Sequence, residues 1–391
     1  MRPGWVKRRL CDVCEVQNGF AFDSAHFNGS RGLPLVRIRS LKNGVETETR
    51  YDGAYEEKYV VRAGDLLVGM DGEFGCYEWK GGPSLLNQRV CRLQNFSAQI
   101  HPRFLLYGLN DHLKVIEDAT GFTTVKHLSS KTILSIEFLL PTFEEQHRIV
   151  RLLDEAFADL ATARANAEKN LQNAREMFES ELNDIFTLHR RGWSNVRLDD
   201  IVSADCSLSY GIVQPGDEVS EGLPIVRPTD LTDPLIGIRG LKRIDPLRAR
   251  GYRRTELHGG ELLLCVRGTT GIVAVASAEL KGANVTRGIV PIRCNSSVLF
   301  QPLAYYAIRS RPVQDQIRRK TYGTALLQIN IRDLREIELS LPPRIQQESI
   351  HKQLNALAAE TRQLEALYTR KLAALDELKA SLLHQAFSGQ L

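Results

Sequence analysis

The chain has 391 residues, and its length, composition and charge already exclude several classes of protein. Hydrophobic residues make up 43% of it, enough for two or three domains with apolar cores. No apolar run approaches membrane-spanning length, and the first residues do not resemble a signal peptide. The seven cysteines are odd in number and scattered, which fits a reducing cytoplasm better than a disulfide framework. We therefore expect a cytoplasmic protein.

One segment of about forty-five residues occurs twice in the chain. The matched pairs, each 201 residues apart, are Pro141 and Pro342, Gln146 and Gln347, Ile149 and Ile350, Leu153 and Leu354, and Phe186 and Phe387. A constant separation means that neither copy has gained or lost a residue. The chain is therefore interpreted as a tandem duplication.

Both copies of the repeat are predicted to form one long helix. Apolar residues recur at steps of three or four from Ile149 to Ile185 and from Ile350 to Ala386, the period of one helix face. A single narrow apolar stripe on so long a helix needs a partner stripe. We expect the two helices to pair as a coiled coil. The alternative is two separate amphipathic helices, each packed on its own domain.

A globular segment precedes each helix, and the two segments also correspond. The matches are Trp5 with Trp193, residues 33–37 (LPLVR) with 223–227 (LPIVR), Gly64, Gly72 and Gly75 with Gly260, Gly268 and Gly271, Arg89 with Arg287, and Gly121 with Gly323. Short apolar runs between glycines predict strands and turns, whereas residues 104–118 and 302–317 have helical spacing. We expect α+β globules, not a doubly wound sheet.

The charge differs between the globular and the helical parts. Residues 1–141 hold 18 Lys/Arg against 16 Asp/Glu, and residues 188–341 hold 22 against 16. The helical segments, 142–187 and 342–391, hold 5 against 10 and 6 against 5. This distribution suits globules that meet a polyanion and a helical rod that need not.

These motifs, in this order, resemble those of the specificity (S) subunit, HsdS, of type I restriction–modification systems, over essentially the whole chain. The most specific are the strand–proline–glutamine junctions, at residues 140–149 and 341–350, and the C-terminal sequence LLHQAFSGQL. A further family trait is the Gly-Asp/Glu-Leu-Leu stretch followed by two glycines.

The resemblance implies a fold and a function. Residues 1–141 and 188–341 would be two target-recognition domains, joined by helical spacers that pair as an antiparallel coiled coil with a pseudo-twofold internal repeat. Such a subunit is not an enzyme. It binds a bipartite, asymmetric site in double-stranded DNA and docks two DNA methyltransferase (M) subunits. It carries no cofactor, since the methyltransferase binds S-adenosylmethionine, and a motor and endonuclease (R) subunit can join.

Candidate DNA contacts lie in loops where the two globules match in position but differ in content. The candidates are Arg37, Arg39, Asp71, Asn87, Gln88, Arg89, Thr123, Thr124 and Lys126 in the first globule, and Arg227, Arg267, Thr269, Asn284, Thr286, Arg287, Arg319, Lys320, Tyr322 and Thr324 in the second. Arginine can donate to guanine O6 and N7, whereas aspartate can only accept, for instance from cytosine N4. Amides suit adenine, and hydroxyls suit phosphate.

The sharpest difference is Asp71 against Arg267, from which we expect two unlike half-sites. For each of these residues the alternative is an ordinary turn with charges in solvent. Arg89 has a different alternative, that of anchoring a strand. For the loops around residues 121–126 and 318–324 the alternative is a solvated helix end.

Enzymatic interpretations have weaker support. The sequence lacks a glycine-rich methyl-donor loop after a strand and an Asn/Asp-Pro-Pro-aromatic motif. Asp65 or Asp71, followed by Glu78 and Lys80, only superficially resembles a nuclease set, which the second globule lacks. Cys11 and Cys14 have redox or zinc spacing without a second pair, so we expect apolar packing and no metal site. The remaining alternatives are a single-chain nuclease or methyltransferase with a built-in recognition domain, and a coiled-coil scaffold.

Overall fold

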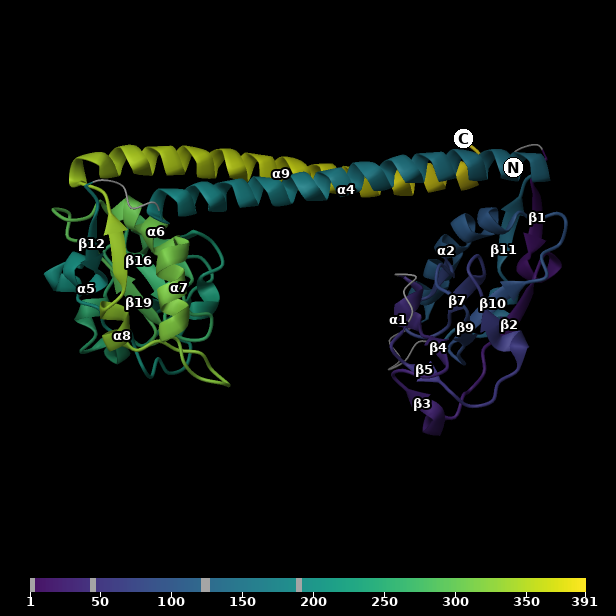
Figure 1. The fold of residues 1–391 in the computed structure, drawn as a ribbon, viewed down its shortest axis with the longest axis horizontal. Helices are drawn as coiled ribbons and strands as arrows, with labels where there is room; N and C mark the ends of the chain where they lie inside the picture. The colour runs from purple at the N-terminus through teal and green to yellow at the C-terminus, as the bar shows by residue number, and fades with distance from the viewer. Residues whose placement is uncertain (1–3, 43–46, 121–126, 188–191) are drawn as a thin grey trace. The chain divides into compact units, whose positions relative to one another are not determined.

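The computed structural model describes residues 4–42, 47–120, 127–187 and 192–391, which group into two compact units. One unit is Met1–Asn166 with Lys371–Leu391, and the other is Ala167–Arg370. Each contains one globule and parts of two long helices, α4 (Phe143–Thr187) and α9 (Arg344–Ser388) (Figure 1). The expected division of the chain at residues 141, 187 and 341 stays a prediction.

The first globule has a mixed α+β fold built on three small sheets. The first sheet has the order β2 (Glu15–Asn18), β10 (Val90–Gln94), β7 (Leu66–Gly69) and β8 (Gly75–Glu78). The second has the order β3 (Phe27–Asn28), β5 (Arg50–Tyr51), β4 (Leu33–Val36), β9 (Ser84–Leu86) and β6 (Val60–Val61). The third pairs β1 (Val6–Arg9) with β11 (Glu137–Leu140), and the helices are α1 (Ile38–Leu41), α2 (Pro102–Ala119) and α3 (Ser130–Leu134).

The second globule repeats this plan. Its sheets have the orders β14 (Leu235–Ile236), β17 (Val273–Ala276), β16 (Leu262–Cys265), β19 (Ile289–Ile292); β15 (Lys242–Ile244), β13 (Leu223–Val226), β18 (Asn284–Val285); and β12 (Ser194–Arg197), β20 (Glu338–Leu341). Its helices are α5 (Leu198–Ile201), α6 (Gln301–Arg309), α7 (Arg311–Lys320) and α8 (Ile331–Arg335). The α+β prediction is confirmed.

The second predicted helical segment is helical but is divided into two helices. The helical spacing of residues 302–317 corresponds to two helices, α6 and α7, because Ser310 between them has an extended backbone with ψ of 147°. Pro312 lies in the first turn of α7, where its missing N–H costs nothing, whereas within one continuous helix it would remove a hydrogen bond.

The strand pairing also corrects one match between the globules. The parallel pairs β4–β9 and β13–β18 have the same register, and so have the antiparallel pairs β7–β10 and β16–β19. Leu86 then corresponds to Val285, and Arg89 to Gly288. The match of Arg89 with Arg287 is wrong by one residue, because hydrogen bonding between strands, and not residue type, sets the register.

A buried glutamine fastens the start of each long helix to a globule. Gln146 is fully buried, and its Oε1 accepts the N–H of His101 at 2.8 Å. Its Nε2 donates to the carbonyl oxygens of Gln99 and Pro141, at 2.9 and 3.0 Å. The side chain therefore satisfies the loop before α2 and the proline before α4 together.

Gln347 makes the matched set of hydrogen bonds in the second unit. Its Oε1 accepts the N–H of Phe300 at 2.7 Å, and its Nε2 donates to the carbonyl oxygens of Val298 and Pro342, both at 3.0 Å. Since buried polar groups are costly when they lack a partner, the junction specifies a polar side chain of this length in both copies.

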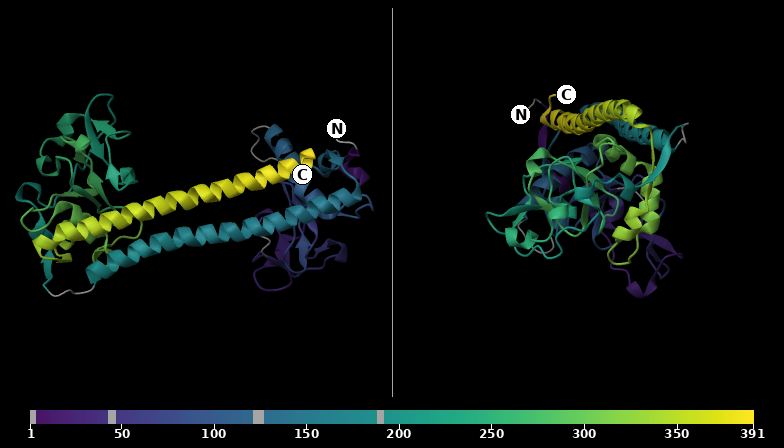
Figure 2. Two further views of the ribbon diagram at one scale, coloured as in Figure 1. Left: turned by 90° about the horizontal axis from the view of Figure 1, so that it is seen from above. Right: turned by 90° about the vertical axis from the view of Figure 1, so that its left-hand side faces the viewer.

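The two long helices run antiparallel within each unit (Figure 2). The contacts are Arg148–Leu391 and Arg164–Asp376 in the first unit, and Arg175–Glu365 and Glu181–Gln353 in the second. In both units a later residue of α4 meets an earlier residue of α9. The predicted stripe of α4, from Ile149 to Ile185, is buried or half-buried throughout. In the predicted stripe of α9, Leu364 and Leu378 are exposed, at 39% and 48%, so this stripe is only partly covered. The expected pairing of the two helices is confirmed by the contacts between them.

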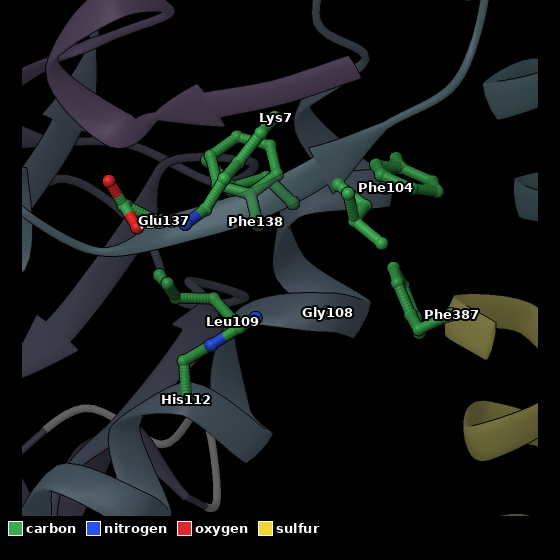
Figure 3. Close-up of a pocket in the computed structure, with 10 residues that line it drawn as sticks. Lys7, Phe104, Gly108, Leu109, His112, Glu137, Phe138 and Phe387 are labelled. Carbon is green, nitrogen blue, oxygen red and sulfur yellow. Dashed lines mark ion pairs between the residues drawn. The ribbon is translucent and has the colours of Figure 1, made fainter. Parts of the chain in front are cut away.

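Each globular core includes side chains from both helices. In the first unit Leu153 of α4 and Ala386 of α9 belong to the same buried cluster as the sheet around β7 and β10. Phe387 faces Phe104 of α2, with ring centroids 4.9 Å apart, beside a cavity of about 210 Å³ (Figure 3). Gly108 makes room for this contact, because a Cβ there would lie 2.5 Å from the Phe387 ring. The last turn of α9 is thereby seated on the globule.

The second unit repeats this packing with the opposite ends of the helices. Leu182 and Phe186 from the end of α4, together with Leu354 from the start of α9, join the core of the second globule. Phe186, the repeat partner of Phe387, lies against Trp193 with ring centroids 6.0 Å apart. Both globules therefore use matched positions of the repeated helix.

The junction leads to a stability prediction. We expect Gln347→Met to lower the free energy of unfolding by about 2–5 kcal/mol, because it leaves the buried N–H of Phe300 and the carbonyls of Val298 and Pro342 without partners. Gln346→Met is the matched control, since Gln346 is exposed, and should change it by less than about 0.5 kcal/mol. Denaturant titration followed by circular dichroism measures both. Equal losses for the two variants would contradict this role.

Candidate nucleic-acid interface

In the first globule, the structure brings several predicted contact residues to one end of two sheets. Strands β7 and β10 are antiparallel, so Asp71, which follows β7, lies at the same end as Arg89, which precedes β10. An isolated backbone bridge joins Asp71 to His127. Strands β4 and β9 are parallel, so Arg37 and Asn87 follow them at a common end. We call this set of loop residues the first reading end.

The carboxylate of Asp71 has two partners within the protein. Its Oδ1 lies 2.6 Å from Nδ1 of His127, and its Oδ2 lies 3.2 Å from Nε of Arg89. The side chain of Asp71 is 13% exposed, whereas that of Arg89 is 64% exposed. A carboxylate so shielded needs such pairing. Its expected role as an acceptor from cytosine N4 therefore competes with two contacts that are already made.

The second reading end is the matched set of loops in the second globule. Arg267 follows β16 and forms an isolated backbone bridge with Gln328, which also bridges Tyr322. The N–H of Thr286 donates to the carbonyl of Val226, the residue before Arg227. These candidates, which are distant in the sequence, are thereby gathered at the corresponding end of the corresponding sheets.

The arginines of the second reading end differ in how they are held. Arg227 is braced by Asp230, with Nε 3.1 Å from Oδ2 and Nη2 2.8 Å from Oδ1, and this hydrogen bonding raises the pKa of Arg227. Within the described part of the chain, no carboxylate forms an ion pair with Arg267 or Arg287. Their guanidinium groups are free to meet an anion or a base edge.

Some candidates fall elsewhere. Asn284 is 2% exposed, its Oδ1 accepts from Thr255 Oγ1 at 2.7 Å, and its Nδ2 donates to the carbonyl of Tyr252 at 3.0 Å. Asn284 is therefore buried within the globule, and the expectation that it lies at the surface is wrong. Lys320 pairs with Glu336 at 2.9 Å on the last turn of α7.

The remaining candidates are described more briefly. Arg39, Gln88, Thr269, Arg319 and Thr324 are exposed. The hydroxyl of Tyr322 donates to Asn330 Oδ1 at 2.6 Å. Thr123, Thr124 and Lys126 lie outside the described residues.

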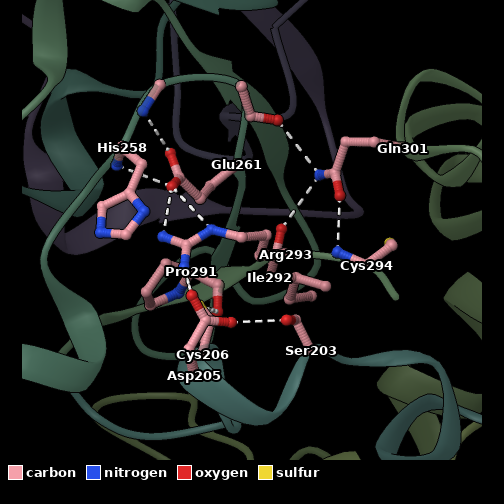
Figure 4. A network of polar contacts seen from close by, with 12 residues as sticks. Ser203, Asp205, Cys206, His258, Glu261, Pro291, Ile292, Arg293, Cys294 and Gln301 are labelled. Carbon is pink, nitrogen blue, oxygen red and sulfur yellow. Dashed lines mark hydrogen bonds and ion pairs between the residues drawn. The ribbon is translucent and has the colours of Figure 1, made fainter. Parts of the chain in front are cut away.

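The acid of the Gly-Asp/Glu-Leu-Leu motif has an architectural role (Figure 4). Glu261 is buried, accepts the backbone N–H of His258 at 2.7 Å and pairs with Arg293 at 2.6 Å. The matched acid of the first globule, Asp65, pairs with Arg92 at 3.2 Å. In both globules this acid closes the turn before a central strand and neutralises an arginine within the same globule.

The described residues also bear on the metal and redox alternatives. Among these residues, no three His, Cys, Asp or Glu side chains are placed to hold a metal ion. The expected apolar packing is confirmed for Cys14, which is buried in the core, but is wrong for Cys11, which is exposed. Burial raises the pKa of the Cys14 thiol to about 12. None of the helices in the described ranges is long and apolar enough to cross a bilayer.

Two residues that hold predicted DNA contacts in position were not predicted from the sequence. His127 and Asp230 each hold a functional candidate in place, yet neither stands in a motif of its own. A signal existed for Asp230, because an acid three residues after Arg227 in a turn can fold back on it. For His127 the only signal was its match with Gln328, 201 residues later.

Cysteine reactivity tests the packing of the first globule. We expect iodoacetamide at pH 7.5 to label Cys11 at least about tenfold faster than Cys14 in the folded chain, because only a thiolate reacts and burial raises the pKa of Cys14. Peptide mass spectrometry measures the rates, and the urea-unfolded chain, in which both should react alike, is the control. Comparable rates in the folded chain would contradict the buried position of Cys14.

Comparison of the sequence with known families gives a match over most of its length. A profile described as the type I restriction modification DNA specificity domain matches residues 3–169 and 178–372. The type I restriction enzyme EcoBI specificity subunit of Escherichia coli is 28% identical over 414 residues, covering 100% of this chain and 87% of that protein. A putative type I restriction enzyme MjaX specificity subunit of Methanocaldococcus jannaschii is 23% identical over 400 residues, covering 90% and 86%.

Solved structures share the fold. A chain from work described as the structural basis underlying complex assembly and conformational transition of the type I R-M system superposes with a TM-score of 0.78 at 19% identity, covering 100% of this chain and 99% of that chain. The HsdS subunit from Thermoanaerobacter tengcongensis superposes with a TM-score of 0.58 at 18% identity, covering 100% and 98%.

Proposed function

We propose that each globule of this chain, which belongs to the family of type I restriction–modification DNA specificity subunits, reads one half of a split site in double-stranded DNA. The main support is that the two reading ends occupy the same end of equivalent sheets, yet carry different side chains at matched positions. Asp71 stands where Arg267 stands, and Arg89 where Gly288 stands. Two globules with the same fold but different side chains at their reading ends suit an asymmetric, bipartite site.

The charges at the two reading ends support a polyanionic ligand. Arg267 and Arg287 have no carboxylate partner among the described residues, and Arg37 likewise forms no ion pair there. A guanidinium can serve a phosphate oxygen or the O6 and N7 atoms of guanine. The hydroxyls and amides beside them, including Thr269 and Gln88, add donors that suit phosphates and bases.

We further propose that the chain assembles with two DNA methyltransferase subunits, which supply S-adenosylmethionine, and that a motor and endonuclease subunit can join. A chain of the same fold comes from a type I R-M assembly, which supports this. Specificity subunits are not catalytic and carry no cofactor of their own. The methyl transfer is therefore assigned to the partner.

The acidic face of α4 is our candidate for the partner surface, and its residues differ in whether they are already engaged within the chain. Asp154 pairs with Arg103 at 2.8 Å and accepts from the hydroxyl of Tyr107, so it belongs to the packing of the first globule. Glu155 and Asp159, one and five residues further on, are exposed. They are the better representatives of this face.

The proposed function is tested by long-read methylation mapping of DNA from cells that carry this chain with its methyltransferase, against cells that lack the chain. We expect one split motif with two unlike halves, which disappears without the chain. Methyl transfer by the purified chain alone, given DNA and S-adenosylmethionine, would favour the single-chain methyltransferase. Absence of any chain-dependent motif would favour the scaffold.

The length of the helices should set the spacing between the half-sites. We expect removal of seven residues from α4 between 160 and 175, with the paired seven of α9 between 365 and 380, to shorten the spacer. Two helical turns correspond to about 10 Å, or about three base pairs, if the helices follow the DNA axis. Methylation mapping measures the spacer. An unchanged spacer with intact half-sites would contradict this role for the helices.

The partner surface leads to a binding prediction. We expect Glu155→Lys with Asp159→Lys to reduce co-purification with the methyltransferase at least about tenfold, because two reversed charges disfavour a complementary basic surface. Glu218→Lys with Glu221→Lys, on exposed positions of the second globule, is the matched control. Unchanged co-purification of the α4 variant, with normal folding, would exclude this face.

A further inference from the structure

We infer that one arginine in each globule reads a guanine, and that the two arginines lie beside non-equivalent β-strands of their globules. In the first globule the arginine is Arg89, braced by Asp71, and in the second globule it is Arg267. This inference rests on the proposed function and names the residues that carry its specificity. It starts from a corner that the two reading ends share. The corner has three positions, which are occupied by Asp71, Arg89 and His127 in one globule and by Arg267, Gly288 and Gln328 in the other.

The backbone of this corner is the same in both globules. Asp71 bridges His127 as Arg267 bridges Gln328. The residues before the bridge also agree, since Met70 accepts an N–H at 2.7 Å from Leu128, and Val266 accepts one at 3.0 Å from Ile329. Differences between the two corners therefore lie in the side chains.

In the first corner, the guanidinium of Arg89 is held by one edge. Oδ2 of Asp71 forms an ion pair with its Nε at 3.2 Å, and Asp71 is itself fixed by a hydrogen bond of its Oδ1 with His127 Nδ1 at 2.6 Å. The Nη1 and Nη2 groups remain on a side chain that is 64% exposed. These two donors form the edge that matches O6 and N7 of guanine. Bracing lowers the rotamer entropy that binding would otherwise cost.

In the second corner, the arginine follows the neighbouring strand, β16, and does not stand at the position that matches Arg89. Gly288 stands in the place of Arg89, and a Cβ there would lie 2.5 Å from Cγ of Pro228 and 3.7 Å from Cβ of Arg267. The space that a side chain at 288 would need is thus already filled, and Arg267 lies next to it. Each corner consequently presents one guanidinium, delivered by position 89 in one globule and by position 267 in the other.

Base reading fits this arrangement better than a phosphate contact. A phosphate accepts donors from many directions, so a flexible cation suffices, whereas a base edge requires a guanidinium plane in one orientation. The shielding of Asp71, at 13% exposure, also separates this pair from an ordinary surface ion pair, which orders little. Asp71 is in this account a positioning residue for Arg89.

The test uses the full chain with its methyltransferase and scores each motif position by methylation mapping. We expect Arg89→Gln to lower discrimination for guanine at one position of one half-site by about 10- to 100-fold, and Arg267→Gln to do so at one position of the other half-site. Asp71→Asn should weaken the same position as Arg89→Gln and no other. Arg8→Gln, on an exposed residue of β1 in a different sheet, is the control and should leave the motif unchanged.

Several outcomes would overturn this inference. A phosphate contact would show as weaker methylation of an unchanged motif, with the dependence of DNA binding on salt reduced by about one charge. A purely structural role of Asp71 would weaken every position of its half-site. Both outcomes still require a chain-dependent split motif, so they differ from failure of the proposed function, in which the unaltered chain itself directs no motif.

Discussion

A buried glutamine, present in both copies of the repeat, ties each long helix to its globule by three hydrogen bonds. Gln146 and Gln347 each join a loop of their globule to the proline that precedes a long helix. Because all three hydrogen-bonding groups of the amide are used in a buried place, neither the helix nor the loop can shift without leaving a polar group unsatisfied. The direction in which each helix leaves its globule follows from this junction.

Packing extends the same repeat to the other end of each helix. The first globule takes Leu153 from the start of α4 and Ala386 from the end of α9, and the second takes Leu354 and Leu182 from the matched ends. A globule is thus held by two helices and not by one. The loops at the reading ends lie outside this packing, so the two globules share one kind of core while they differ at these loops.

The sequence was sufficient for the parts of the molecule in which a repeat or a period carries the signal. The spacing of Pro141 and Pro342 and the apolar stripes predicted both helices and their pairing, because burial along a helix leaves a regular trace. The sequence was insufficient to predict side-chain contacts between residues that are distant along the chain. The brace of Asp71 by His127, the internal position of Asn284 and the register of Gly288 all depend on strand pairing between remote segments, which leaves no local pattern.

We propose that each globule reads its own half-site from a matched position on the repeated helices. The most direct test of this proposal is methylation mapping with a chain whose second globule, residues 192–341, is replaced by a copy of residues 4–140. The copy would meet matched helix residues, since Leu354 and Phe186 repeat Leu153 and Phe387. We expect a new motif with two like halves, both equal to one half of the parental motif. A motif that keeps its two unlike halves would contradict it.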